Sequence, residues 1–270
     1  MGAFRENLLE GKTAFIAGGT SGINLAIAEA YVRAGANVAV LSRKQEKVDT
    51  AVERLGALAN GAGVAGFAAD VRDYDAVKAA ADAAASQFGP LGVVISGAAG
   101  NFICPAEQLT ANGFKTVVEI DLIGTFHVLR ASYDVCEKPG ASFISISAPQ
   151  SSTPFWGQAH VCAAKAGVDM LTKSLAFEWG PHGVRVNAIV PGPIAETEGM
   201  ERLAATPVLE AAVKRSVSLR RYGAKSEIAD MALFLASDAA AYVTGGVFPC
   251  DGGQLLAGGA ATHPESIAAG

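Results

Sequence analysis

Long apolar runs are missing from this 270-residue sequence, although half of its residues are hydrophobic. No run approaches the roughly 18 residues of a membrane span, which argues against a transmembrane segment. The first residues, MGAFRENLLEGK, carry charges where a secretory signal needs an apolar stretch. The last residues, SIAAG, match neither a peroxisomal nor an endoplasmic-reticulum address. These absences predict a cytoplasmic protein that does not associate with membranes.

A large net charge and closely spaced cysteines are missing too. The formal net charge is −5 and only 17% of the residues are charged, with the basic ones scattered. We therefore expect neither a nucleic-acid interface nor binding to an anionic membrane surface. The four cysteines form no CxxC pair and the four histidines do not cluster. Reduced cysteines, without a disulfide framework or a metal site, are the expectation.

Seven short apolar runs alternate with longer alanine-rich stretches of helical period. The runs are TAFIAG, NVAVLS, VAGFAAD, LGVVIS, ASFISIS, VRVNAIV and GGVFPC. Strands separated by helices predict βαβ units and a parallel sheet covered by helices on both faces. We expect a single doubly wound, Rossmann-like α/β domain over residues 1–270, with a loose tail from about residue 256.

A glycine-rich turn follows the first run, in TAFIAGGTSGINLAIAEAYVRAG. Such a turn lets the backbone approach a pyrophosphate, and the start of the next helix attracts its negative charge. An ordinary tight turn is the alternative, but the place of the turn after the first strand favours nucleotide binding. The residues expected to hold the diphosphate are Gly18, Thr20, Ser21, Gly22 and Ile23.

Basic residues end the second run, where an acidic residue would bind the ribose hydroxyls of NAD. Ser42, Arg43 and Lys44 stand there instead. Arg43 directly after the strand suits a 2′-phosphate, because a guanidinium binds phosphate through charge-assisted, bidentate hydrogen bonds. A solvated basic pair at a helix start is the alternative. We expect NADP(H) as the cofactor.

These features, together with three further segments and Lys165, resemble the short-chain dehydrogenase/reductase family. The segments are AADV at 68–71, ISGAAG at 95–100 and VNAIVPGPI at 186–194, and the similarity runs from Gly11 to Gly253. The resemblance implies that Asp70 and Val71 contact the adenine and that residues 191–194 flank the nicotinamide. The other cofactor contacts that it implies are Ala98, Lys165, Pro191, Gly192 and Ile194.

Several positions depart from the pattern of that family. Asn24 replaces the third glycine of the turn, Asp121 replaces an asparagine, and Ala148 and Val161 stand where the catalytic serine and tyrosine belong. The segments AAGNFICPAEQLTANGFKTVVEIDLIGTF and PGPIAETEGMERL resemble one branch, the 2,4-dienoyl-CoA reductases, particularly the peroxisomal type. That branch lacks the serine–tyrosine pair in its usual places and uses NADPH. The resemblance implies an acyl-CoA substrate and a homotetramer.

Reduction of a conjugated dienoyl thioester needs no phenol at the carbon that accepts the hydride. It needs donors for the developing thioester oxyanion and a positioned proton source. Asn101 could donate to that oxygen, or cap a turn. Asp121, on an apolar helix face, could hold a proton-delivering water, or be buried and satisfied by backbone amides. Asp251, before two glycines, could share the water, or form a turn.

The helix around Lys165 carries the remaining candidates. Lys165 is expected to bind the nicotinamide ribose and to stabilise negative charge. His160 projects about 100° away from the tyrosine position, so we expect a structural or substrate-lining role for it rather than acid chemistry. Phe102, Phe155 and Trp156 could line an acyl-chain channel together with Asn101, unless they belong to the core.

Two other functions stay open. The chain could reduce another carbonyl or enoyl-CoA compound, with His160 as the acid. It could also be a catalytically silent NADP(H)-binding protein, which the missing serine–tyrosine pair and Asn24 favour. The presence of Asn101, Asp121 and the 197–199 segment favours the dienoyl-CoA reductase, because decay gives no reason for a complete alternative set of residues.

Overall fold

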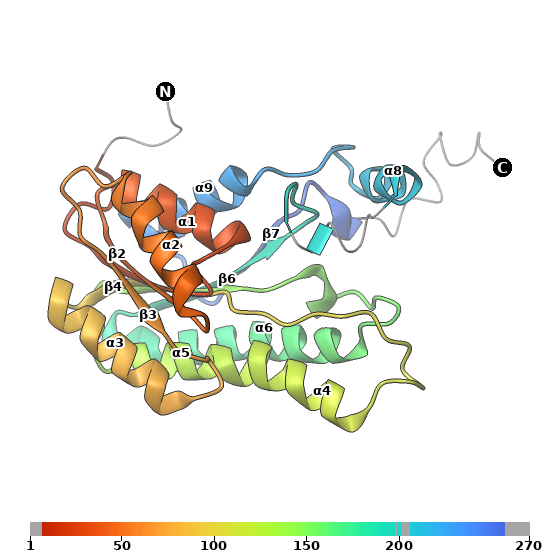
Figure 1. Cartoon of the computed structure of the whole chain (residues 1–270), viewed down its shortest axis with the longest axis horizontal. Coiled ribbons are helices and arrows are strands. Elements are labelled where there is room, and N and C mark those ends of the chain that lie inside the picture. The colour runs from red at the N-terminus through yellow and green to blue at the C-terminus, as the bar shows by residue number, and fades with distance from the viewer. Residues whose placement is uncertain (1–6, 198, 201–205, 257–270) are drawn as a thin grey trace.

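The centre of the computed structural model, which describes residues 7–197, 199–200 and 206–256, is one parallel seven-stranded sheet (Figure 1). Its strand order is β3-β2-β1-β4-β5-β6-β7. The strands are β1 (Thr13–Ala17), β2 (Asn37–Ser42), β3 (Val64–Ala68), β4 (Leu91–Ser96), β5 (Ser142–Ile146), β6 (Arg185–Pro191) and β7 (Val247–Cys250). The predicted doubly wound α/β fold and its seven strands are confirmed. The predicted tail, apart from Leu256, lies outside the described residues.

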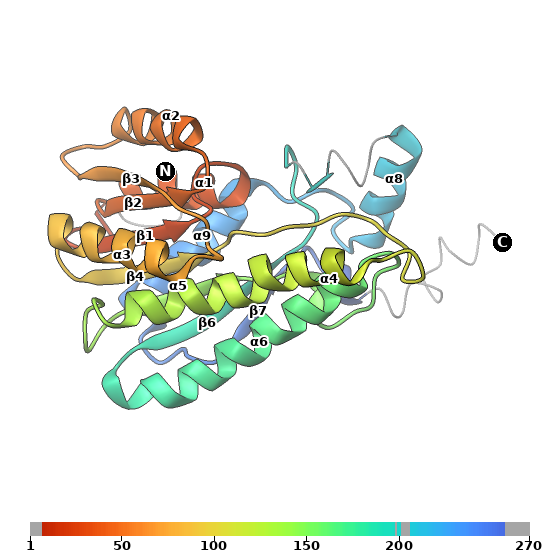
Figure 2. The same cartoon turned by 60° about the horizontal axis from the view of Figure 1, so that its bottom comes forward.

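Helices cover both faces of the sheet, as Figures 1 and 2 show. One face carries α1 (Gly22–Arg33), α2 (Gln45–Gly56) and α9 (Lys225–Ala236), and the other carries α3 (Tyr74–Phe88), α5 (Gly124–Tyr133) and α6 (Ala159–Trp179). The α4 helix (Ala111–Val118) continues into α5 through a π-helical segment, η1 (Glu119–Ile123), and α8 (Pro207–Ser216) lies at one end of the molecule, away from the sheet. Within the described ranges, no helix combines the length and hydrophobicity that crossing a bilayer requires.

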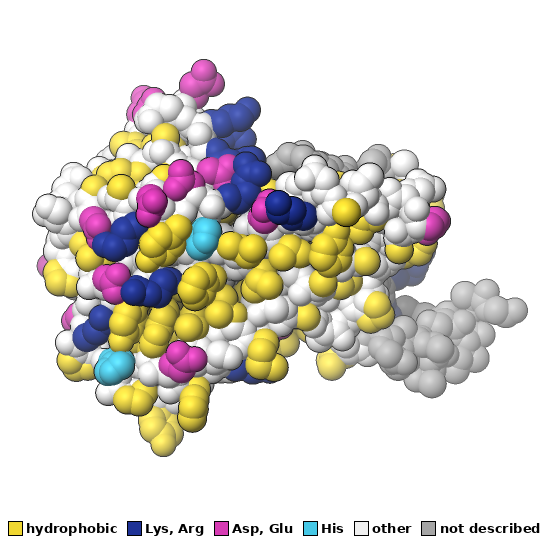
Figure 3. Space-filling model, turned by 90° about the horizontal axis from the view of Figure 1, so that it is seen from below, with side chains coloured by type: hydrophobic (Ala, Val, Ile, Leu, Met, Phe, Trp, Pro, Cys, Tyr) yellow, Lys and Arg dark blue, Asp and Glu magenta, His cyan; other side chains and the backbone are white. Residues whose placement is uncertain are grey.

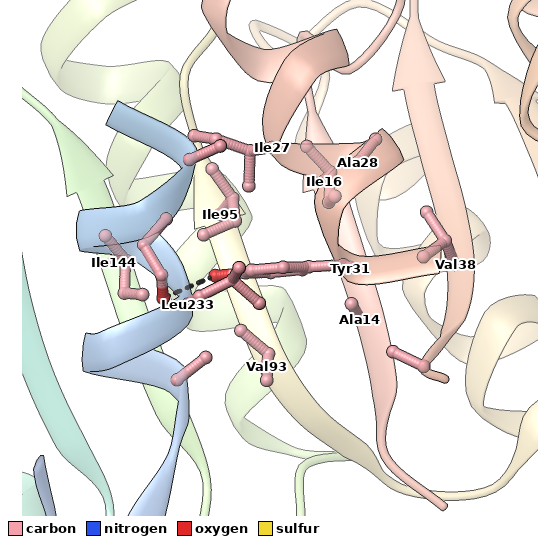
Figure 4. Close-up of a cluster of buried hydrophobic side chains, with 14 of the residues drawn as sticks. Ala14, Ile16, Ile27, Ala28, Tyr31, Val38, Val93, Ile95, Ile144 and Leu233 are labelled. Atoms are coloured by element: carbon pink, nitrogen blue, oxygen red, sulfur yellow. Dashed lines mark hydrogen bonds between the residues drawn. The ribbon is translucent and has the colours of Figure 1, made fainter. Parts of the chain in front are cut away.

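The central strands are buried on both faces, which explains why they read as continuous apolar runs rather than alternating ones. Every residue of β1 and β4 is buried. Between the sheet and the α1–α9 pair, the core surrounds Tyr31 (Figure 4). The Tyr31 hydroxyl donates to the carbonyl of Ala232 in α9 at 2.9 Å, and burial raises the pKa of this phenol. Tyr31 thus joins the two helices through a neutral hydrogen bond.

All seven strands are parallel, so the loops that follow them gather at one edge of the sheet. In open α/β sheets this carboxyl edge holds the ligand, at the point where the strand order reverses. Here the order reverses between β1 and β4. The expected cofactor and substrate residues follow these strands or lie on the adjoining helices.

Candidate active site

The turn between β1 and α1 has the geometry that a diphosphate needs. Gly18 has φ +80°, and a Cβ on it would stand 2.9 Å from the backbone nitrogen of Ala98 after β4. Gly22 has φ +57°, with no atom within 4 Å of where its Cβ would be. Ser21 is the N-cap of α1, its hydroxyl makes no capping bond, and the first turn has no acidic residue. Open backbone amides and hydroxyls at a helix start fit the diphosphate of a dinucleotide.

Asn24, the departure from the glycine pattern, joins α1 to the end of β4. Its Nδ2 donates to the carbonyl of Gly97 at 2.8 Å, and the residue is buried. A Cβ at Gly97 would collide with this amide. The asparagine therefore points at the neighbouring strand and connects two segments of the expected nucleotide site.

At the adenosine end of the site, the structure adds a residue that the sequence reading missed. Arg43 and Lys44 are exposed after β2, as expected. Asp70, after β3, is bound by Arg72, whose Nε and Nη2 donate to its two carboxylate oxygens at 3.0 and 2.7 Å. Hydrogen bonding to Arg72, with a smaller contribution from the charge of Arg43, lowers the pKa of Asp70. Arg72 thus fixes the carboxylate beside the expected adenine site.

Asp121 and Lys165 form a buried ion pair. The π-helical segment η1 places Asp121, which is 1% exposed, so that its Oδ1 accepts from the backbone nitrogen of Gly100 at 2.7 Å. Its Oδ2 lies 3.4 Å from Nζ of Lys165, which also donates to the carbonyl of Ile146 at 3.0 Å. The pair joins the β4 loop, η1, α6 and the end of β5. π-Helical turns are rare in proteins overall, but those that occur are often found at functional sites. This arrangement therefore marks a candidate reaction centre.

The two positions that hold the catalytic serine and tyrosine in the family hold no hydroxyl side chain here. Ala148 precedes the 3-10 turn η2 (Pro149–Ser151). Val161 is buried in an apolar cluster with Val117 and Ala164 between α4 and α6. The neighbouring Ser147 does not substitute for the missing serine, because its Oγ is 2.5 Å from Oδ1 of Asp169 and donates to it.

His160 is fully buried under the 101–104 loop. Its ring contacts that of Phe102, with centroids 4.3 Å apart and the ring planes tilted by 36°, while Phe102 itself is 41% exposed. Neither ring nitrogen makes a hydrogen bond of ordinary geometry to a described residue. Burial lowers the pKa of His160, although the Phe102 backbone and the charge of Asp121 act in the opposite direction. The lowered pKa favours the neutral imidazole, and a structural or substrate-lining role for His160 stays a prediction.

The other expected substrate residues are scattered around this edge. Asn101 is exposed, directly after the loop residue that binds Asp121. Trp156 is 79% exposed and Phe155 is half-buried. Asp251 makes a turn: its Oδ1 accepts from the nitrogen of Gly253 and its Oδ2 from that of Leu255, both at 2.8 Å. A water-holding role for Asp251 stays a prediction.

The segment after β6 lies against the segment after β7. The backbone nitrogen of Gly192 donates to the carbonyl of Cys250 at 3.1 Å, and a Cβ on Gly192 would collide with the backbone of Asp251. Pro191 and Ile194 are buried. The expected nicotinamide-flanking segment is therefore brought next to Asp251.

The sequence reading also missed two glutamines beside the absent hydroxyls. Gln150 lies two residues after Ala148, and Gln158 lies seven residues before Lys165. Nε2 of Gln150 donates to Oε1 of Gln158 at 2.6 Å. In the sequence, these two glutamines could have been found from their spacing to the positions of the family's serine, tyrosine and lysine.

Comparison with known proteins gives consistent matches over almost the whole chain. Residues 17–254 match a family profile described as enoyl-(acyl carrier protein) reductase. A peroxisomal 2,4-dienoyl-CoA reductase [(3E)-enoyl-CoA-producing] of Danio rerio is 43% identical over 254 residues, covering 94% of this chain and 84% of that protein. A probable 2,4-dienoyl-CoA reductase [(2E)-enoyl-CoA-producing] of Bacillus subtilis is 40% identical, covering 92% and 98%. The crystal structure of a short chain dehydrogenase from Bacillus anthracis has a TM-score of 0.82 and 35% identity, covering 93% and 98%.

These matches correct the expected location. The Danio rerio relative is named as a peroxisomal enzyme, and so are relatives from mammals, a yeast and a plant. The prediction of a cytoplasmic protein is therefore wrong. The prediction rested on the absence of recognised signals, and such an absence does not identify a compartment.

Proposed function

Because this chain belongs to the short-chain dehydrogenase/reductase family of oxidoreductases, we propose that it is an NADPH-dependent reductase of 2,4-dienoyl-CoA thioesters. The observation that carries the proposal is the Asp121–Lys165 pair, buried at the carboxyl edge where the family's serine and tyrosine hydroxyls are absent. A ketone reductase needs such a hydroxyl to protonate an alkoxide. A dienoyl thioester does not, because its negative charge moves away from the reduced carbon.

The cofactor site would be formed by the β1–α1 turn, the basic residues after β2, and Asp70 held by Arg72. NADPH, when bound, supplies a hydride. Arg43 would pair with the 2′-phosphate, since guanidinium and phosphate form charge-assisted bidentate bonds. Lys165, held by Asp121 and the carbonyl of Ile146, would bind the nicotinamide ribose and present a positive charge to the substrate.

The electron flow in the substrate defines what the remaining residues must do. Hydride adds to C5, the C4–C5 π bond breaks, and its electron pair moves through C3 and C2 to the thioester oxygen. Asn101 would donate to the resulting dienolate oxygen. Asp121, with Asp251, would hold a water that gives its proton to C2, leaving the double bond between C3 and C4. A proton delivered to C4 would give the 2-enoyl product instead.

The test mixes the protein with NADPH and 2,4-hexadienoyl-CoA and follows the nicotinamide absorbance. Oxidation of NADPH that requires the CoA ester is the expected result. A product that enoyl-CoA hydratase does not hydrate identifies the 3-enoyl isomer. Turnover of simple ketones would support the carbonyl reductase, and NADPH binding without turnover of either substrate would support the silent nucleotide-binding protein.

Assembly into a homotetramer belongs to the same proposal. Several large apolar side chains are exposed on η1, α5 and α6: Ile123, Phe126, Met170 and Phe177. Figure 3, which views the molecule from the side of these helices, shows apolar side chains gathered between charged ones. Contiguous exposed apolar surface is typical of a protein interface. Analytical ultracentrifugation should show a tetramer, and Phe177→Glu should shift the distribution to smaller species.

A further inference from the structure

Two glutamine side chains form an isolated amide pair at the carboxyl edge of the sheet. Gln150 lies in η2, which begins three residues after the end of β5, and Gln158 is the N-cap of α6. Nε2 of Gln150 donates to Oε1 of Gln158 at 2.6 Å. Gln158 is 2% exposed, yet its side chain makes no capping bond to the helix. Its position is therefore not explained by helix capping.

This pair leaves hydrogen-bonding capacity unused. Oε1 of Gln150 is buried without a partner. Nε2 of Gln158 makes no hydrogen bond to a described residue. Buried polar groups in proteins are almost always hydrogen-bonded, so the open oxygen of Gln150 needs an explanation. Exchanging oxygen and nitrogen in both amides leaves the same result: one open NH2 donor and one open carbonyl acceptor.

The pair lies where the family's hydroxyl groups are missing. Gln150 follows Ala148 by two residues, and Gln158 precedes Val161 by three. Gln158 also precedes Lys165 by seven residues, which is close to two helical turns, so both lie on the same face of α6. On that face, Lys165 is the residue that presents charge at the reaction centre.

As a hydrogen-bond donor to the thioester oxygen, an amide is better suited to this reaction than a hydroxyl group. The dienolate oxygen needs a hydrogen bond, but its proton must go to carbon, so a donor that does not titrate favours the correct product. Beyond the sulfur, two methylene groups separate the thioester from the N–H of the cysteamine amide of CoA. An acyl-CoA thus offers one acceptor and one donor, which complements the open NH2 and the open carbonyl of the pair.

From this complementarity we infer that the Gln150–Gln158 pair binds the thioester end of the acyl-CoA, its NH2 donating to the thioester oxygen and its open carbonyl accepting from the cysteamine amide. The inference rests on the proposed function for its substrate class. It names a donor in addition to Asn101, and it replaces the lost serine and tyrosine with groups that cannot transfer a proton.

The binding test compares two ligands on the full chain with NADP+ present, by calorimetry: hexanoyl-CoA and S-hexyl-CoA, a thioether without the carbonyl oxygen. The unmodified protein should bind the thioester about two- to tenfold more tightly, the range expected for one neutral hydrogen bond. Gln158→Leu and Gln150→Leu should each reduce that preference. Gln87→Leu, a change of an exposed glutamine on α3, is the matched control and should keep it.

The kinetic test measures turnover of 2,4-hexadienoyl-CoA by the same variants. Gln158→Leu should lower kcat ~10²–10³-fold, as loss of one oxyanion donor does, without moving the pH profile, because an amide does not titrate. The NADPH Kd and the unfolding temperature of the variants show that the fold is retained. A thioester preference that is absent in the unmodified protein, or unchanged in both leucine variants, overturns the inference. If the protein does not turn over dienoyl-CoA, but binds the thioester more tightly than the thioether and loses this preference in Gln158→Leu, the proposed reaction is refuted and this binding site is supported.

Discussion

Replacement of Asp121 by asparagine tests the buried ion pair with almost no change of shape. The asparagine oxygen can still accept from the nitrogen of Gly100, as Oδ1 of Asp121 does at 2.7 Å. Its NH2 group, however, would face the ammonium of Lys165, now 3.4 Å from Oδ2. Two donors would then point at each other, and the lysine charge would lose its counter-ion in a site that is almost closed to solvent.

The size of the effect follows from that burial. Removing one partner of a buried pair typically costs about 3–5 kcal/mol, because the remaining charge stays desolvated. One kcal/mol lowers the Tm of a chain of this size by about 2–4 °C, so Asp121→Asn should lower it by about 6–20 °C. Turnover should fall ~10²–10⁴-fold, the loss expected for a positioned acid–base group.

Differential scanning fluorimetry and NADPH oxidation with 2,4-hexadienoyl-CoA measure the two effects, at a temperature where the variant is folded. Asp121→Asn combined with Lys165→Met is the control, because it removes both charges. The double variant should recover most of the lost Tm while turnover stays low, since no unpaired charge then remains buried. Unchanged turnover and Tm in Asp121→Asn would refute the catalytic and the structural reading of the pair together.

Three further changes test the cofactor end, the core and the buried imidazole. Arg43→Asp should weaken NADPH binding far more than NADH binding in fluorescence titrations, and equal affinities of the unmodified protein for both cofactors would contradict the 2′-phosphate assignment. Tyr31→Phe, which loses the bond to Ala232, should lower the free energy of unfolding by about 0.5–1.5 kcal/mol in urea, and no change would show that this hydrogen bond contributes nothing. Burial lowers the pKa of His160, so the unfolded chain takes up a proton first as the pH falls below about 6.5, and stability is lost. His160→Gln should therefore make the Tm less sensitive to acidification from pH 7 to pH 5, and an equal acid sensitivity of both proteins would contradict this.

The fold could be predicted because its signals are local. Each strand is a short apolar run between helical stretches, and a parallel sheet buried on both faces needs little more information than that. The candidate site was partly predictable for the same reason: residues at the carboxyl ends of parallel strands meet at one edge. Gly18 and Arg43 could thus be placed from their positions after β1 and β2, whereas the expectation for Asp70 came from the resemblance to the family.

The partners of the site residues could not be predicted, because they depend on packing between distant segments. The 3.6-residue period identified the apolar face around Asp121, but not the π-helical segment that places this carboxylate between Gly100 and Lys165. Asn24 looked like a defect of the glycine turn, whereas its amide bonds to Gly97, 73 positions away along the chain. Such contacts become visible only when the helices are placed on the sheet.

The energetics of the Asp121–Lys165 pair also bear on whether this chain is a silent nucleotide-binding protein. A buried ion pair is weak evidence for stability, because desolvation of the two charges can exceed their attraction. A protein that only binds the cofactor would lose little by carrying apolar residues at both positions, as it carries Val161 and Ala148 in place of the hydroxyls. The pair instead combines a strand-end amide, a π-helical turn and a lysine on the active-site helix. A buried pair that is weak evidence for stability, at the place where the proposed reaction needs a charge-stabilising group, argues for catalysis at this edge, with the proton and the oxyanion handled by groups other than a phenol.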